Sequence, residues 1–90
     1  MRLRHKVDNN QTAIVKALRS VGASVVDLSG VGVGCPDIAC GYRGVNYFFE
    51  IKGPEGKLTP QQLRWNRRWR GECALVRSAS EALYVIGALK

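Results

Sequence analysis

The sequence predicts a single α/β domain whose elements follow the order αβββαβα. Three observations lead to this prediction: apolar side chains recur at helical spacing near both ends of the chain, two strand-like runs joined by a glycine turn occupy its middle, and capping residues mark helix starts. Ninety residues are enough for one domain, so we expect residues 1–90 to fold as a unit, with residues 1–7 as a flexible basic arm. The sequence has no run of about 18 apolar residues, so no membrane span is predicted.

The first helix is predicted over residues 9–21. Its apolar residues recur at helical spacing and are Ala13, Ile14, Ala17, Leu18 and Val21. Asp8 and Gln11 fit the N-cap and N3 positions of a capping box, and Gly22 ends the helix. A strand is expected over residues 24–28.

A loop with glycine at positions 30, 32 and 34 follows this strand. It leads into Pro36 and a strand rather than a helix, and no Gly-Lys-Ser/Thr follows, so a nucleotide-binding loop is excluded. We expect the glycines to let the chain bend tightly into a site or pass close to a DNA backbone.

A β-hairpin is predicted next, with strands over residues 38–42 and 46–52 and a turn over residues 43–45. Side chains alternate between the two faces of a strand. Glu50 and Lys52 therefore share one face with Phe48, while Tyr47, Phe49 and Ile51 take the other. Folding of the hairpin brings Asp37, which immediately precedes it, toward Glu50 and Lys52.

The second helix is predicted to start at Thr59-Pro60-x-Gln62, with Thr59 as N-cap, Pro60 at N1 and Gln62 at N3, and to run to about Arg70. Two tryptophans, Trp65 and Trp69, lie on one side of this helix. We expect them to belong to the core, with base stacking as the alternative.

A short strand over residues 73–77 and a last helix complete the order. Ser78 and Glu81 fit a capping box at the start of that helix. Its apolar stripe consists of Ala82, Val85, Ile86 and Leu89.

The combination of Asp37, Glu50 and Lys52 is the strongest functional signal. Two carboxylates at one place suit Mg²⁺, a hard cation that prefers oxygen ligands. An ammonium group beside them can orient a water or stabilise developing charge. A carboxylate in an aromatic strand is costly unless it is paired or bound to metal. The alternative is a Glu–Lys pair on an edge strand.

These residues give the chain a family resemblance over about residues 8–89. Three segments carry this resemblance: Gly34-Cys35-Pro36-Asp37, Glu50-Ile51-Lys52-Gly53 and Leu58-Thr59-Pro60-Gln61-Gln62-Leu63-Arg64-Trp65. They resemble the VRR-Nuc (virus-type replication-repair nuclease) domain of the PD-(D/E)xK superfamily, in particular the stand-alone forms of phages and prophages. The resemblance implies a restriction-endonuclease-like fold with a central mixed four-stranded sheet flanked by helices.

The resemblance also implies further site residues. The backbone carbonyl of Ile51 would be a metal ligand, and Gln62 would lie near the metal and the scissile phosphate, a role that can coexist with capping. Many members carry an acidic residue on the first helix, but this helix has no Glu. Gln11 and Asp8 are therefore candidates only for a contributory role.

The charge of the chain favours a phosphate-bearing partner. Fourteen Lys and Arg against seven Asp and Glu leave a net charge of +7. The candidate DNA-binding residues are Arg43, Lys57, Arg64, Arg67, Arg68 and Arg70. The alternative is that these side chains only form a solvated surface.

The cysteines argue against a disulfide framework or a zinc site, because their number is three and no CxxC spacing occurs. Cys40 and Cys73 are expected to be small core residues, and Cys35 to adjoin the site. A reducing cytoplasm, that of a bacterial host for a phage or prophage protein, fits this usage.

The sequence thus predicts a Mg²⁺- or Mn²⁺-dependent endodeoxyribonuclease. The resemblance implies that it acts as a homodimer on branched DNA such as four-way (Holliday) junctions, and a C₂ dimer would supply the two active sites that cutting two strands requires. Two alternatives stay open: a nucleic-acid-binding module without turnover, and a nuclease subunit of a phage replication or packaging complex.

Overall fold

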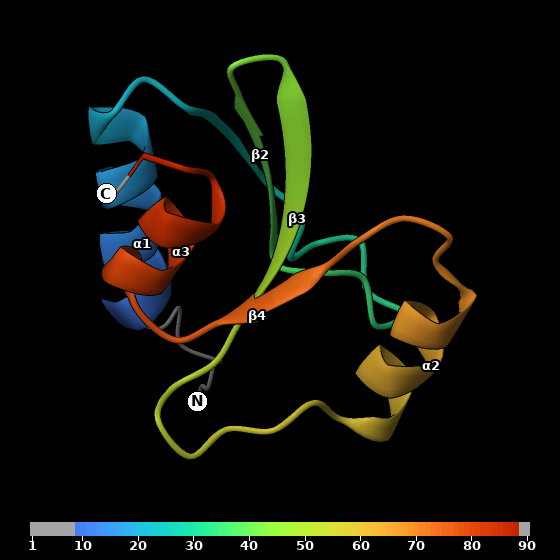
Figure 1. The fold of residues 1–90 in the computed structure, drawn as a ribbon. Coiled ribbons are helices and arrows are strands. Elements are labelled where there is room, and N and C mark those ends of the chain that lie inside the picture. Colours follow the sequence, from blue (N-terminus) through green and yellow to red (C-terminus); the bar gives the residue numbers. More distant parts are fainter. Residues whose placement is uncertain (1–8, 89–90) are drawn as a thin grey trace.

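The computed structural model describes residues 9–88 and confirms the predicted order (Figure 1). The predictions for residues 1–7, Asp8 and Leu89 lie outside the described residues. The elements are α1 (Asn9–Ser20), β1 (Ser24–Asp27), β2 (Ile38–Tyr42), β3 (Val45–Ile51), α2 (Pro60–Arg68), β4 (Ala74–Val76) and α3 (Ala79–Val85). None of these helices is long and apolar enough to cross a membrane.

The four strands form one mixed sheet, as expected, and their order in it is β1-β2-β3-β4. The first two pairings are antiparallel, and β4 joins β3 in parallel. The β2–β3 turn contains two residues, Arg43 and Gly44, and not the three predicted, because Tyr42 and Val45 already pair. Both turn residues have positive φ, 51° and 83°, as the right-handed twist of a two-residue hairpin demands.

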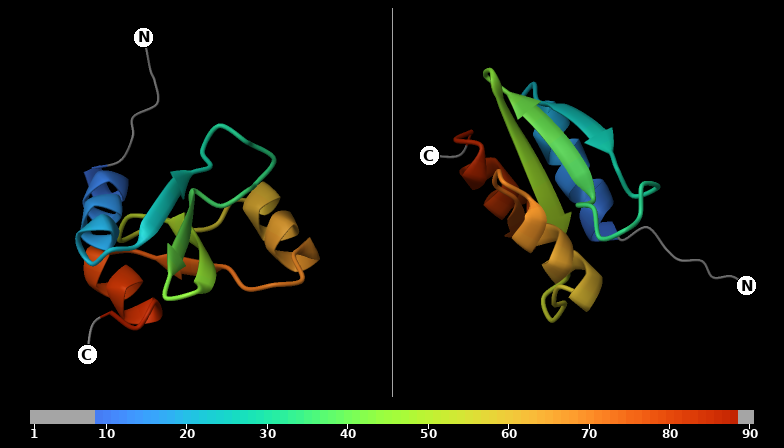
Figure 2. Two further views of the ribbon diagram at one scale, coloured as in Figure 1. Left: turned by 90° about the horizontal axis from the view of Figure 1, so that it is seen from above. Right: turned by 90° about the vertical axis from the view of Figure 1, so that its right-hand side faces the viewer.

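The hydrophobic core lies on one face of the sheet, under α1 and α3 (Figures 1 and 2). Phe49 and Ile51 point into it from β3, which confirms the predicted alternation. The fully or largely buried apolar residues are Ile14, Leu18, Ala23, Ile38, Cys40, Phe49, Ile51, Val76, Ala82 and Ile86. Val85 was expected in the stripe of α3 but is 40% exposed, because it faces an open groove beside β3 and β4 and not the core.

Helix α2 stands apart on the other face of the sheet (Figure 2). α2 contains no buried residue, and Trp69, which follows it, is 42% exposed, so the prediction that Trp65 and Trp69 belong to the core is wrong. The rings of Trp65 and Trp69 stack on each other with centroids 4.8 Å apart, and both stand roughly perpendicular to the ring of Phe48, at centroid distances of 6.0 and 5.1 Å. The physical reason is that this face of the sheet carries only one helix and offers the indoles a single aromatic side chain, Phe48. The two indoles therefore pack on each other and on Phe48, and no core forms around them.

The ends of the later elements differ slightly from prediction. α2 ends at Arg68 because Trp69 is already extended, with ψ of 125°. Before α3, Ser78 is the N-cap, but Glu81 does not close the predicted capping box: its Oε1 accepts from the backbone N–H of Arg77 at 2.6 Å.

Candidate active site

Asp37 is fixed at the point where β2 begins. Its backbone N–H donates to the carbonyl of Phe49 at 3.0 Å, and its Oδ2 accepts from the backbone N–H of Ile51 at 2.7 Å. The preceding Pro36 is buried. The carboxylate is therefore held against the end of β3, as the hairpin pattern predicted.

Glu50 is the buried charged residue of the described chain, with 1% of its surface exposed. It lies on the face opposite Phe49, toward α2. Its Oε2 accepts from the Nε2 of Gln62 at 2.7 Å, whereas its Oε1 has no hydrogen-bond partner among the described residues. A buried, unpartnered carboxylate oxygen is costly and is uncommon in folded proteins unless a ligand uses it.

The electrostatics tie Asp37, Glu50 and Lys52 together. The pKa of Glu50 is raised to about 8, first by burial, then by the charge of the neighbouring Asp37 carboxylate and by a side-chain hydrogen bond with Asp37 that favours the protonated form, and the Lys52 ammonium opposes the rise. The three side chains predicted from the sequence are thus close enough for each charge to act on Glu50.

Gln62 serves two purposes, as the sequence allowed. Its Oε1 accepts from the N–H of Thr59 at 2.8 Å, while its own N–H donates to the Thr59 hydroxyl at 3.2 Å, which completes the predicted capping box. Its amide nitrogen meanwhile holds Glu50. Local capping therefore orients the side chain that contacts the carboxylate.

The glycine loop bends tightly into the site, one of the two roles expected for it. Gly34 has φ of 83°, and a Cβ added there would lie 2.4 Å from the carbonyl oxygen of Gln61. The loop therefore packs directly against the first turn of α2. This contact positions α2 relative to Asp37, three residues after Gly34.

Lys52 is held from two sides by residues that sequence reasoning missed. Its carbonyl accepts from Asn10 of α1 at 2.9 Å, and its aliphatic stem packs on Gly56, where an added Cβ would lie 3.1 Å away. The guanidinium of Arg77 binds the carbonyls of Gly53 and Gly56 at 2.5 and 2.8 Å and fixes that loop. No local pattern signals partners that are 42 and more than 20 residues distant in the chain.

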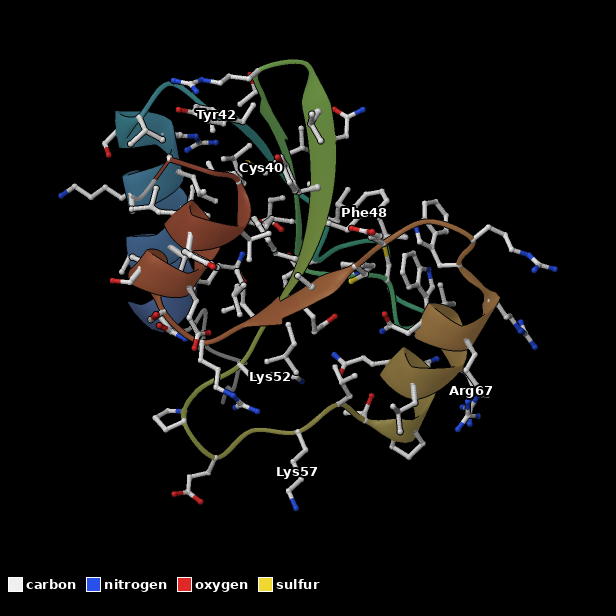
Figure 3. The ribbon with its side chains drawn as sticks, in the orientation of Figure 1. Cys40, Tyr42, Phe48, Lys52, Lys57 and Arg67 are labelled. Carbon is white, nitrogen blue, oxygen red and sulfur yellow. The ribbon has the colours of Figure 1, made fainter. Side chains whose placement is uncertain are left out.

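The other predicted residues are spread more widely. Gln11 lines a groove along α1 with Asp27, away from the hydrogen bonds that join Asp37, Glu50 and Gln62. Arg43 lies over the ring of Tyr42 at the hairpin tip, 5.2 Å from its centroid. Figure 3 shows Lys57 and Arg67 extending into solvent, and the other predicted DNA-binding residues, Arg64, Arg68 and Arg70, are exposed as well.

The cysteines are free thiols. Cys40 is buried in the core as predicted, but Cys73 is only half-buried and lies beside the site. Burial first, and then the charge of Glu50, raises the pKa of Cys73 to about 11. Residues 9–88 contain no cluster of three or more His, Cys, Asp or Glu suited to a metal ion, so a cation here would depend on two carboxylates and backbone oxygens.

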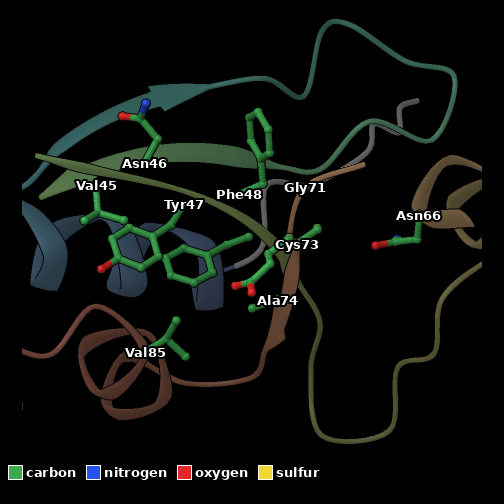
Figure 4. Close-up of a pocket in the computed structure, with 11 residues that line it drawn as sticks. Val45, Asn46, Tyr47, Phe48, Asn66, Gly71, Cys73, Ala74 and Val85 are labelled. Atoms are coloured by element: carbon green, nitrogen blue, oxygen red, sulfur yellow. The ribbon is translucent and has the colours of Figure 1, made fainter. Parts of the chain in front are cut away.

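A separate groove of about 620 Å³ lies between β3, β4 and α3 (Figure 4). Tyr47 and Val85 lie on one side of β3 and Asn46 and Phe48 on the other. Neither Asp37 nor Glu50 lines it, so this groove is distinct from the carboxylate site.

The sequence matches no protein-family profile and no curated protein. A solved structure described as a VRR_NUC domain does match, with a TM-score of 0.69 and 30% sequence identity, over 84% of this chain and 88% of that chain. Together with the mixed sheet and the Asp37–Glu50–Lys52 arrangement, this similarity shows that the chain belongs to the VRR-Nuc family of nuclease domains and has its PD-(D/E)xK-like α/β fold.

Proposed function

We propose that this protein is a metal-dependent endodeoxyribonuclease and that Asp37, Glu50 and Lys52 form its catalytic unit. One observation carries the proposal: Glu50 is almost completely buried beside Asp37, yet its Oε1 has no partner among the described residues. A divalent cation would satisfy that oxygen and offset the cost of burying the charge.

The available donors fit Mg²⁺ or Mn²⁺. Asp37 and Glu50 supply carboxylate oxygens, and the carbonyl of Ile51 is the third candidate. The N–H of Ile51 faces Asp37, and in a strand the carbonyl of a residue leaves on the same edge as its N–H. When bound, the ion would supply Lewis-acid chemistry, activating water near neutral pH and neutralising charge on the phosphate.

The other site residues have roles that follow from their contacts. Lys52 would orient the attacking water or stabilise charge that develops on the phosphate. Gln62 would hold the Glu50 carboxylate in one orientation through its 2.7 Å hydrogen bond. Gln11 lies in a different groove, so we assign it no contact with the metal.

The substrate is proposed to be DNA held mainly through its phosphates. The net charge of +7 supports this, as do the exposed side chains of Arg43, Lys57, Arg64, Arg67, Arg68 and Arg70. Phosphate contacts carry no sequence information, so selectivity would come from DNA shape, and branched DNA such as a four-way junction is the proposed preference.

A homodimer would supply the two active sites that symmetrical cutting of a junction requires. The groove between β3, β4 and α3 is the proposed contact with a second copy. Val45, Tyr84 and Val85 on or beside it are 50%, 72% and 40% exposed, and large exposed side chains that gather in one place support an interface. The bacterial cytoplasm is the proposed location.

The test is cleavage of a panel of linear, flap and four-way-junction DNA by the purified protein with Mg²⁺ or Mn²⁺. We expect metal-dependent cutting that Asp37→Ala, Glu50→Ala and Lys52→Ala each abolish. Asp27→Asn is the matched control, because Asp27 is an exposed carboxylate whose Oδ1 accepts from the backbone N–H of Ser29 at 2.8 Å, away from the carboxylate site. Near wild-type cutting by Glu50→Ala would contradict the assignment.

A further inference from the structure

A second groove, of about 380 Å³, lies between the glycine loop and the exposed surface of α2. We call it the tryptophan groove; its lining residues are Val33, Gln61, Arg64, Trp65, Arg68 and Trp69. Its volume is within the range of sites that hold small organic groups. Neither the core nor the carboxylate site uses it.

The indoles form a preorganised aromatic surface. Trp65 and Trp69 are stacked with an interplanar angle of 15°, and the ring of Phe48 packs roughly perpendicular to both. Gly71 packs against Trp69, since an added Cβ there would lie 2.9 Å from the indole nitrogen. Trp69 nevertheless remains 42% exposed, so a substantial part of the indole surface is held in place and left open.

The opposite wall carries backbone strain. Val33 has φ of 52°, a conformation that a β-branched residue rarely adopts, and its side chain is 68% exposed. Strain of this kind persists where the surrounding structure enforces it and is concentrated at ligand-binding positions. Here a turn over residues 32–35 enforces it: the N–H of Cys35 donates to the carbonyl of Gly32 at 3.0 Å, and the two central residues, Val33 and Gly34, both have positive φ.

The charges in the groove favour an anionic aromatic ligand. Arg64 and Arg68 are four residues apart on α2 and therefore lie on the same side of the helix, beside the indoles. The described lining includes no acidic residue. Gln61 is adjacent in sequence to Gln62, which holds Glu50, so the groove is next to the carboxylate site.

We propose that the tryptophan groove binds an unpaired nucleotide of the DNA substrate, with its base stacked on the indoles and its phosphate paired with Arg64 and Arg68. Stacking tolerates any base, because every base has a π-face. The groove would thereby favour DNA with single-stranded character close to the cut. This inference deepens the proposed nuclease function and rests on it for the identity of the ligand.

Intrinsic fluorescence tests the proposal directly, because Trp65 and Trp69 are the two tryptophans of the 90-residue chain. The protein is titrated without metal, so that no cleavage occurs, with single-stranded oligothymidine, a blunt duplex and inorganic polyphosphate. We expect strong quenching by oligothymidine and little by polyphosphate. Equal quenching by all three would overturn the proposal, because it would show a general response to anion binding.

Variants separate stacking from a purely structural role of the indoles. Trp69→Ala should weaken oligothymidine binding by about 5- to 100-fold, with a much smaller effect on the blunt duplex. Trp69→Phe should retain most of the affinity. Val26→Ala, which shortens an apolar side chain that is 57% exposed on β1, is the control and should change neither.

Thermal unfolding followed by circular dichroism checks that each variant is folded. Arg68→Gln then tests the phosphate contact of the groove without altering the indoles. Arg68→Gln should weaken oligothymidine binding and leave quenching at saturation intact. Equal losses for single strand and duplex in Trp69→Ala would overturn the inference. A wild-type protein that cuts DNA but shows no quenching contradicts this inference alone, whereas quenching without cleavage of any DNA contradicts the nuclease proposal alone.

Discussion

The two faces of the sheet differ in kind, although adjacent residues of one strand build them. On the face under α1 and α3, Phe49 and Ile51 are buried in an apolar core. On the face toward α2, Phe48 meets two half-exposed indoles, and Glu50 is buried with a carboxylate oxygen that lacks a partner in the described chain. One face therefore stabilises the fold, and the other holds the groups suited to chemistry.

This separation explains how so small a domain can carry a costly buried carboxylate. A domain of this size has a stability of only about 5–10 kcal/mol, and a buried charge consumes part of it. Because the apolar core is continuous on the opposite face, the site can be optimised for function without interrupting it. Substitutions on the two faces should accordingly differ in both stability and activity.

The largest expected effect on stability is that of Phe49→Ala. Phe49 is fully buried, so its removal leaves a cavity and should cost about 3–5 kcal/mol in the free energy of unfolding. Urea unfolding followed by circular dichroism measures this. Phe48→Ala is the matched change on the other face and should cost about half as much, since Phe48 is only partly buried. Equal costs would show that the two faces are not distinct.

Glu50→Gln is expected to have a smaller effect on the free energy of unfolding, and to stabilise the protein where Phe49→Ala destabilises it. The pKa of Glu50 is raised from the ordinary 4.5 to about 8, so between these values the folded protein retains a proton that the unfolded chain releases. Stability should therefore fall as the pH rises from about 4.5 to about 8, and Glu50→Gln should not show this fall.

Thermal unfolding at pH 5 and pH 8, without divalent metal, measures the difference. At about pH 8 the Glu50→Gln variant should be more stable than wild type by about 1–3 kcal/mol, and at about pH 5 nearly equal to it. A wild type that is the more stable of the two at the higher pH would be inconsistent with the burial of an uncompensated charge.

The contact between the glycine loop and α2 gives a third, intermediate effect. Gly34→Ala should lower the free energy of unfolding by about 1–3 kcal/mol, because the new side chain has to adopt a positive φ and clashes with Gln61. The rate of DNA cleavage should fall as well. Gly32→Ala is the control: it has a similar φ of 77° but open space around its Cβ position, so it should cost only about 1 kcal/mol. Denaturant midpoints that match for the two variants would mean that the loop does not pack on α2 as described.

The smallest effect on stability is expected for Gly56→Ala. The new methyl group would lie 3.1 Å from the Cβ and 3.3 Å from the Cδ of Lys52, so the Lys52 side chain and the loop have to shift by a few tenths of an ångström, at a cost of about 1 kcal/mol in the free energy of unfolding. Cleavage should nevertheless fall several-fold, because Lys52 is moved. Gly53→Ala, whose Cβ position is open, is the control and should keep full activity. Single-turnover cleavage rates distinguish them, and unchanged rates for Gly56→Ala would argue against a positional requirement for Lys52.

Much of the site could be predicted because it depends on local patterns. Strand alternation placed Glu50 and Lys52 on one face, and the capping signature fixed Gln62 at the start of α2. Asn10 and Arg77 could not be predicted, because their bonds to distant carbonyls exist only after folding. The position of Trp65 and Trp69 was predicted wrongly for a related reason: amphipathic spacing identifies the helix face that makes contacts, but not whether a core lies opposite.

The most direct test of the division between the two faces is a calorimetric titration of Mn²⁺ into the folded protein. We predict that wild type binds the ion at the α2 face, that Glu50→Gln weakens binding at least about tenfold, and that Asp27→Asn leaves it unchanged. Each variant is first shown to be folded by its thermal unfolding curve. Wild-type affinity in folded Glu50→Gln would contradict the claim that the unpartnered carboxylate oxygen of Glu50 is there to hold a cation.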